Sequence, residues 1–466
     1  MCDNQKRIQN YVDAHRQELV DAVRALVAVP SVKGAAEPGK PFGPGPAAAL
    51  DKALELAAGW GLSVSRDEGY VGLCDLNGEE DALHILAHLD VVDPGTGWSS
   101  DPYQAVERDG VLYGRGVADD KGPALAAMLA LRAVKETGIP LRKNARLILG
   151  TDEESGSGDI AHYYAGHPYA PHSISPDAEF PVINIEKGHF HPVFTQTWPE
   201  EADLPRVAEL KGGIRLNVVP PEAEALVLGL EESVLSQAAG RAGESTGAAF
   251  ELRPEAGGVR VTARGRNAHA STPDEGNNAV TALLALLAGL PLADCPSTRA
   301  VRELARLFPH GDNGGRALGI AQADHSGPLT LTFSLFRLDG RGCSGQFDAR
   351  VPLCAGEENC GRPARDALAR AGFQAEGELG AGHEVAEDSP FIRLLLDCYE
   401  AHTGRKGACL AIGGGTYVHG IPGGVAYGPF EQDYDCRMHG ADERAPVEAL
   451  LTCAKIYADV IVRLCS

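Results

Sequence analysis

The chain has 466 residues, 44% of them hydrophobic, which is enough apolar side chain for more than one folded domain. Its formal net charge is −22, so it lacks the basic surface with which proteins bind nucleic acid or an anionic membrane. No run of about 18 apolar residues is present that could cross a bilayer. The 11 cysteines lack CxxC spacing and no secretory leader is evident, which predicts reduced thiols and a cytoplasmic protein.

The first 80 residues predict helices and one strand. Apolar residues recur at helical spacing and the pattern ends at Pro30, so a helix is expected over residues 5–29. The Gly- and Pro-rich stretch 34–46 predicts a loop. A second helix is expected over residues 47–60, and a strand is expected at Val64.

The segment Ala82–Val92 predicts a strand buried on both faces, as parallel strands in α/β proteins are. His88 and Asp90, near its carboxyl end, are two residues apart, so an extended chain points both side chains the same way. That geometry suits an imidazole metal ligand beside a carboxylate that fixes its tautomer. Functional sites in α/β proteins form at the carboxyl ends of parallel strands. His84 is expected to be structural.

Two adjacent aspartates, Asp119 and Asp120, follow a glycine-rich stretch. A helical pattern begins near Pro123 and stops at Gly138. Asp is common at the start of helices, so the pair predicts either an acidic N-cap or a metal site.

A second acidic group follows the next predicted strand, at residues 145–150. Glu153 and Glu154 lie directly after it, and adjacent carboxylates repel each other unless a proton or a cation lies between them. Asp177 precedes another predicted strand at residues 182–186. These residues predict either a solvated acidic turn or further metal ligands.

The composition changes near Lys187. Strand-forming pieces, 213–220 and 259–264, alternate there with helical runs such as 278–290, and a helix over residues 390–403 marks the return of the α/β pattern. We therefore predict an inserted α+β domain, termed the lid. The expected division is a first α/β part at residues 1–186, the lid at residues 187–385, and a second α/β part at residues 386–466.

Three consecutive glycines, Gly413, Gly414 and Gly415, occur in the last part. Backbone N–H groups before a helical turn can bind an anion. The lysine of phosphate-binding loops and the glycine spacing of dinucleotide-binding proteins are both missing, so a nucleotide site is not expected.

Six motifs in order carry a family resemblance: His88-x-Asp90, Gly114–Gly122, Asp152–Gly156, Asp177, Asn267–Ser271 and Met438–Gly440. Together they resemble the co-catalytic zinc peptidases, which include aminoacylases, succinyl-diaminopimelate desuccinylases, glutamate carboxypeptidases and the bacterial PepV-type dipeptidases. The PepV-type enzymes are the most similar. The resemblance implies that residues 1–186 and 386–466 form an α/β catalytic domain, with a mixed, largely parallel sheet between helices, interrupted by the inserted α+β lid. It implies too that the lid has two subdomains.

The resemblance also implies a metal centre. Asp119 would bridge two Zn²⁺ ions, for which Co²⁺ or Mn²⁺ can substitute. His88 and Asp177 would complete one site, and Glu154 and His439 the other. Three carboxylates and a bridging hydroxide would balance the four positive charges, and His and carboxylate are suitable zinc ligands.

The remaining implied roles concern the reaction. Glu153 would be the general base that takes a proton from the water shared by the metals, and Asp90 would orient His88. In the lid, His269 would stabilise the oxyanion. Asn217 and Arg350, with the three-glycine loop, would hold the substrate carboxylate.

The implied activity is hydrolysis of the peptide bond of dipeptides or short peptides that have a free C-terminal carboxylate. An N-acyl-amino-acid deacylase would use the same centre. A non-catalytic binding protein is less favoured, since every proposed ligand and the base are present. A doubled lid would supply His269 in cis, so we expect a monomer whose partner is a small peptide substrate.

Overall fold

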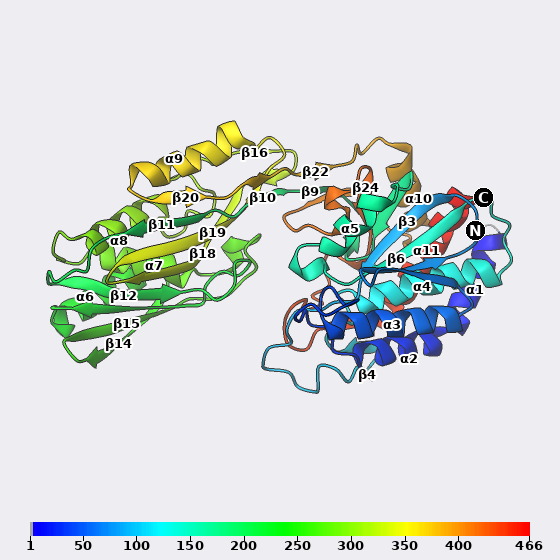
Figure 1. Ribbon diagram of the computed structural model, residues 1–466, viewed down its shortest axis with the longest axis horizontal. Helices are drawn as coiled ribbons and strands as arrows, with labels where there is room; N and C mark the ends of the chain where they lie inside the picture. Colours follow the sequence, from blue (N-terminus) through cyan, green and yellow to red (C-terminus); the bar gives the residue numbers. More distant parts are fainter. Residues whose placement is uncertain (1–2) are drawn as a thin grey trace. The chain divides into compact units, whose positions relative to one another are not determined.

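The computed structural model describes residues 3–466 and divides into two compact units (Figure 1). The first unit contains the residues up to Ile185 together with Glu384–Leu410 and Gly415–Ser466. The second unit contains Glu186–His383 and Ala411–Gly414. The second unit thus begins one residue before the expected limit of 187 and its main segment ends two residues before the expected limit of 385. Composition gave no sign that part of the three-glycine loop belongs to the second unit.

Three helices begin the first unit: α1 (Asp3–Ala14), α2 (Arg16–Val27) and α3 (Pro44–Gly59). The prediction of one helix over residues 5–29 is wrong, because the chain leaves helical geometry at His15, with φ −104° and ψ 16°. The His15 ring lies 2.7 Å from the carbonyl oxygen of Tyr11, and this contact accompanies the break. Periodicity alone does not reveal it, because apolar residues on both helices enter the same core.

A nine-stranded sheet forms the centre of the first unit, in the order β1-β2-β6-β3-β7-β24-β9-β22, with β23 paired to β9. Its middle strands β6, β3, β7 and β24 run parallel, whereas β1, β2 and β9 are antiparallel to their neighbours. The expected mixed sheet is confirmed. The strands are β1 (Ser63–Asp67), β2 (Val71–Asp75), β3 (Asp81–His88), β6 (Asn144–Gly150), β7 (His172–Ser175), β9 (Val182–Glu186), β22 (His383–Glu384), β23 (Cys409–Ile412) and β24 (Gly424–Ala426).

Helices pack against this sheet, and the most enclosed is α4 (Lys121–Glu136), whose apolar residues belong to the main hydrophobic core. The predicted helices after Pro123 and over residues 390–403 are confirmed. No helix within residues 3–466 is long and apolar enough to span a membrane. The other elements of this unit are α5 (Gly158–Gly166), α10 (Pro390–Thr403), α11 (Val447–Cys465), β4 (Val106–Arg108), β5 (Val111–Tyr113), β8 (Ala178–Phe180), β25 (Pro429–Glu431) and β26 (Arg444–Pro446).

The second unit is built on one ten-stranded sheet in the order β14-β15-β13-β12-β18-β19-β10-β21, to which β11 and β20 are attached. The residues predicted to form the lid share this sheet and one hydrophobic core, and the division into two subdomains stays a prediction. The strands are β10 (Gly188–Phe190), β11 (Val193–Thr197), β12 (Arg206–Gly212), β13 (Glu222–Leu228), β14 (Ala249–Glu255), β15 (Gly258–Arg264), β18 (Thr330–Asp339), β19 (Gly342–Val351), β20 (Gln374–Glu376) and β21 (Leu379–Gly380). Outside the sheet, β16 (Ala323–Asp324) pairs with β17 (Gly327–Pro328).

Three sequence predictions for this unit can be compared with the structure, and two of them are confirmed. The strand over residues 259–264 and the helix over 278–290 are confirmed, with ends shifted by one or two residues. The strand over residues 213–220 is wrong, because these residues form a loop. Gly213 turns the chain with φ 80°, and a Cβ there would lie 1.7 Å from the carbonyl oxygen of Ser334. Only glycine can make this close approach.

Helices cover one face of the second sheet (Figure 1), and we call the face without helices the uncovered face, although loops contact part of it. The helices are α6 (Glu232–Thr246), α7 (Ala279–Ala288), α8 (Pro296–Leu307) and α9 (Arg362–Arg370). On β19, Phe347 and Ala349 enter the core beneath these helices. Because side chains alternate along a strand, Asp348 and Arg350 point to the uncovered face.

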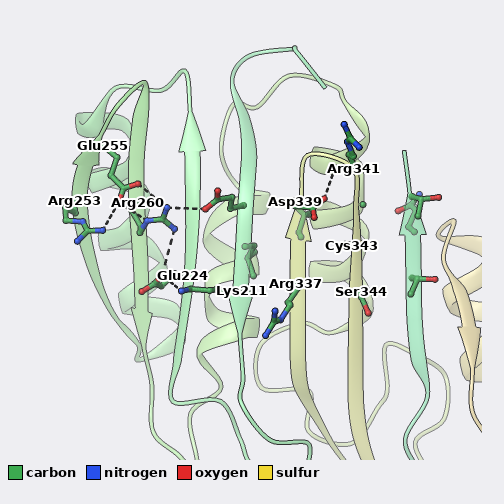
Figure 2. Close-up of a pocket in the computed structure, with 17 residues that line it drawn as sticks. Lys211, Glu224, Arg253, Glu255, Arg260, Arg337, Asp339, Arg341, Cys343 and Ser344 are labelled. Carbon is green, nitrogen blue, oxygen red and sulfur yellow. Dashed lines mark hydrogen bonds and ion pairs between the residues drawn. The ribbon is translucent and has the colours of Figure 1, made fainter. Parts of the chain in front are cut away.

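The uncovered face also carries a hollow where β18 ends and β19 begins (Figure 2). Most of its charged side chains pair with one another. Arg260, for example, lies 2.9 Å from Glu255 and 3.9 Å from Glu224. None of the predicted site residues lines this hollow. Its charged side chains are explained by the ion pairs that they form with one another.

Candidate metal centre and substrate-binding residues

Strand ends in the first unit present the predicted acidic residues and His88 together. His88 is the last residue of β3, Glu153 and Glu154 form a short helical turn after β6, and Asp177 follows β7. Because β6, β3 and β7 are parallel neighbours, their carboxyl ends lie at one edge of the sheet. The predicted site therefore forms where ligands of α/β proteins usually bind.

Asp119 lies between two histidines. Its Oδ1 atom is 2.9 Å from Nε2 of His88, and its Oδ2 atom is 2.8 Å from Nε2 of His439. The candidate ligand atoms fall into two groups, each within 4.8 Å: His88 with Glu153 and Asp177, and Asp119 with Glu154 and His439. Since each oxygen of Asp119 faces a different imidazole, its carboxylate has the geometry of a bridge between two metal sites.

The donor set fits divalent metal ions. Oε1 of Glu154 is buried and has no hydrogen-bond partner in the described part of the chain, and Nε2 of His88, although 2.9 Å from Oδ1 of Asp119, does not have hydrogen-bond geometry with it. Leaving a buried polar atom without a partner is costly, and coordination of a cation would satisfy both atoms. Nitrogen and carboxylate oxygen, with no thiolate, suit Zn²⁺, Co²⁺ and Mn²⁺.

Without a cation, Glu153 and Asp177 bind a proton more tightly than an ordinary carboxylate does. Burial, together with the charge of Asp177, raises the pKa of Glu153 well above its usual range. Burial and the neighbouring Asp119 raise the pKa of Asp177 to about 6. Burial alone would lower the pKa of His439, but its hydrogen bonds to Asp119 and Glu154 raise that pKa to about 11.

Metal binding should therefore release protons. At neutral pH His439 carries a proton in the metal-free protein and must lose it to become a ligand, so metal affinity should fall as the pH falls. Calorimetric titration of the metal-free protein with Mn²⁺, in buffers of different ionisation enthalpy, measures the number of protons released. An affinity that does not change between about pH 6 and pH 8 would contradict this assignment of ligands.

Asp90 has a broader structural role than orienting His88. Its backbone carbonyl accepts the Nδ1–H of His88 at 3.0 Å, which leaves Nε2 available to a metal. Its carboxylate lies 3.5 Å from Nδ1 and accepts the backbone N–H groups of Glu153 and Glu154 at 3.1 and 3.2 Å. Asp120, although at the N-cap of α4, accepts the backbone N–H of His88 at 3.0 Å and does not cap the helix.

Sequence reasoning missed Glu443, whose side chain is fully buried. Its carboxylate accepts the backbone N–H groups of Gly116, Ala118 and Asp119 at 2.9 to 3.1 Å. It also binds the guanidinium of Arg115 at 2.6 Å. Glu443 thus holds the loop that presents the bridging aspartate. The only signal in the sequence is its position four residues after His439.

Replacing Glu443 should destabilise this loop. In Glu443→Gln, an amide N–H₂ faces backbone donors and Arg115 keeps a buried, uncompensated charge, so the free energy of unfolding should fall by about 3 kcal/mol. Urea denaturation of the metal-free protein measures this change. Glu448→Gln is the control, because Glu448 is exposed on α11. Equal urea midpoints for the two variants would contradict the role of Glu443.

The predicted substrate-binding residues of the lid meet within the second unit. The backbone carbonyl of Asn217 accepts the N–H of Ala270, next to His269, at 2.9 Å. Arg350 donates from Nη1 to the carbonyl oxygen of Gly413 at 2.7 Å. A Cβ at Gly413 would lie 2.9 Å from the Cβ of Ser271 and 3.6 Å from the Cγ of Arg350, so the glycine loop packs against both segments. Gly414 belongs to the same unit, whereas Gly415 belongs to the first.

Arg350 is held in one orientation by Asp348, which sequence reasoning also missed. The Nε and Nη2 atoms of Arg350 donate to the two carboxylate oxygens of Asp348 at 2.7 and 2.9 Å. Asp348 is fully buried and also lies 3.1 Å from Nε2 of His191. A guanidinium has five N–H donors. These three bonds use three of the five donors and leave one N–H on Nη1 and one on Nη2.

The two ligand groups are suited to metal ions, and comparison with known proteins identifies the class of protein as a peptidase. A profile described as peptidase family M20/M25/M40 matches residues 84–463. The chain belongs to this family, which confirms the resemblance found in the motifs.

Full-length relatives support the same assignment. The protein YtjP of Bacillus subtilis (strain 168) is 34% identical over 462 residues, covering 96% of this chain and 97% of YtjP. The Beta-Ala-Xaa dipeptidase of Lactobacillus delbrueckii subsp. lactis is 30% identical and covers 97% of both chains. Human carnosine dipeptidase 1 has the same fold, with a TM-score of 0.58 at 17% identity and 99% coverage of both chains.

Proposed function

We propose that this peptidase is a dipeptidase that uses two divalent metal ions, Zn²⁺ in the first instance with Co²⁺ or Mn²⁺ as substitutes. The observation that carries the proposal is the position of Asp119 between His88 and His439, with Glu153 beside the first group of ligands. The similarity to a Beta-Ala-Xaa dipeptidase along nearly the whole chain supports a dipeptide substrate.

The two ions would be held by His88, Asp119 and Asp177 on one side and by Asp119, Glu154 and His439 on the other. When bound, they supply the Lewis acidity that makes water acidic enough to deprotonate near neutral pH. Glu153 accepts that proton and passes it to the nitrogen of the leaving amino acid. Asp90 keeps Glu153 and Glu154 in place through their backbone N–H groups.

The lid residues supply substrate recognition in this proposal. The two remaining N–H donors of Arg350 match the two oxygens of a carboxylate, which favours substrates with a free C-terminus. Asn217 and the glycine loop at 413–415 flank the same group. His269 donates a hydrogen bond to the oxygen of the scissile carbonyl as negative charge develops there. Because the same chain contains both units, we propose that the enzyme acts as a monomer. The cysteines within residues 3–466 are unpaired, and we propose that the enzyme acts in the cytoplasm.

An N-acyl-amino-acid deacylase is the alternative, because N-acyl amino acids present the same carboxylate to Arg350. The values of kcat/KM for a panel of dipeptides and N-acyl amino acids decide between the two. Dipeptidase activity predicts a preference for dipeptides, whereas a preference for acylated amino acids would assign the protein as a deacylase.

Two neighbouring glutamates should differ in their roles. Glu153→Gln should keep both metal ions and lose activity by a factor of about 10² or more, because it removes the general base. Glu154→Gln should lose metal as well as activity, because it removes a ligand. Metal content by mass spectrometry and kcat for both variants measure the difference. If the two variants behaved in the reverse manner, the roles of base and ligand would have to be exchanged.

Arg350 should distinguish free acids from amides. Arg350→Ala should raise KM for a free dipeptide by about 10² or more, because a charge-assisted pair of hydrogen bonds is lost, and should change KM for the amidated dipeptide far less. Arg337→Ala is the matched control, an exposed arginine further along the same uncovered face of the sheet. Equal effects of Arg350→Ala on the two substrates would contradict carboxylate recognition by Arg350.

A further inference from the structure

Two hydrogen bonds converge on one nitrogen of His269. The Oγ atom of Ser271 lies 2.6 Å from Nδ1, and the backbone N–H of Ser271 donates to the same Nδ1 atom at 3.3 Å. A backbone N–H can only donate a hydrogen bond, so Nδ1 must accept it. In a neutral imidazole the proton then resides on Nε2, and the hydroxyl of Ser271 also donates to Nδ1.

The position of Ser271 is itself well defined. The loop carrying His269 is fixed on one side by the bond from Ala270 to Asn217 and on the other by Thr332, whose hydroxyl donates to the carbonyl of Ala270 at 3.2 Å. Gly413 packs against Ser271 so closely that a methyl group on it would need the serine to move. The serine hydroxyl therefore stays beside the imidazole.

We propose that Ser271 is a positioning residue that fixes the tautomer of His269, so that the imidazole is a neutral donor through its Nε2–H. This inference rests on the proposed function, in which His269 donates to the carbonyl oxygen of a peptide substrate. The opposite tautomer would present a lone pair to that oxygen, and the two would repel. Ser271 thus determines whether His269 attracts or repels the negative charge that develops on the carbonyl oxygen.

The tautomer can be observed without any assay of activity. In protein with ¹⁵N-labelled histidine, nitrogen chemical shifts and long-range couplings distinguish a protonated Nε2 from a protonated Nδ1. The signals of His269 are those missing from the spectrum of His269→Ala. We expect the Nε2–H form. A spectrum showing Nδ1–H in the intact protein would overturn the inference and leave the proposed dipeptidase activity untouched.

Kinetics of Ser271 variants provide the second test. Ser271→Ala keeps the backbone donor but loses the hydroxyl, so kcat for a dipeptide should fall about 5- to 10-fold, the equivalent of one hydrogen bond, with KM changed by less than about twofold. Ser271→Thr retains the hydroxyl and should restore most of kcat. Ser344→Ala is the control, because Ser344 is exposed on β19 and lies outside the candidate site.

Each kinetic outcome either supports or contradicts the positioning role of Ser271. A fall in kcat that threonine reverses supports the positioning role. An unchanged kcat in Ser271→Ala, or a loss that threonine does not reverse while circular dichroism shows a folded protein, would overturn it. If neither the intact protein nor any variant hydrolysed dipeptides, the proposed function would fail, and the nitrogen spectrum would still report whether Ser271 fixes the tautomer.

Discussion

The candidate metal centre of the first unit depends on several carboxylates and two imidazoles gathered around Asp119, of which the His88 ring is fully buried and the His439 ring partly exposed. Burial raises the pKa values of Glu153 and Asp177, and repulsion from the neighbouring carboxylates raises them further. Two divalent cations would remove this repulsion, and they would satisfy buried atoms that lack hydrogen-bond partners. The site is therefore organised for cations, and its surroundings hold the ligands in place against their mutual repulsion.

Carboxylates outside the ligand set provide much of that support by accepting backbone N–H groups. Asp90 binds the turn that carries Glu153 and Glu154, and Asp120 binds the backbone of His88. Glu443 binds the loop that carries Asp119. The second unit repeats the principle at Asp348, which orients Arg350 through two hydrogen bonds. In each case one buried acidic group converts a flexible side chain or loop into a fixed one.

Four of the five candidate ligands end or follow a strand or precede a helix, which local patterns in the sequence reveal. His88 follows an apolar run, and Asp119 precedes the helix α4. His439, in contrast, lies in the loop between β25 and β26 and was indicated by the family resemblance alone. The sequence did not reveal Glu443 or Asp348, since their partners are set by tertiary contacts. Glu443 binds a backbone group 324 residues away, and Asp348 is one of many acidic residues in strands. Local patterns also misread residues 213–220, where a close approach to Ser334 replaces the strand.

We propose that Asp119 joins two metal sites into one centre. Electron paramagnetic resonance of the protein loaded with two equivalents of Mn²⁺ tests it directly, because ions that share a bridging carboxylate are magnetically coupled. We predict a spectrum of coupled ions for the unaltered protein. For Asp119→Asn we predict the signals of isolated ions or the binding of a single ion. Two uncoupled ions in the unaltered protein, or binding of only one ion at saturation, would contradict it.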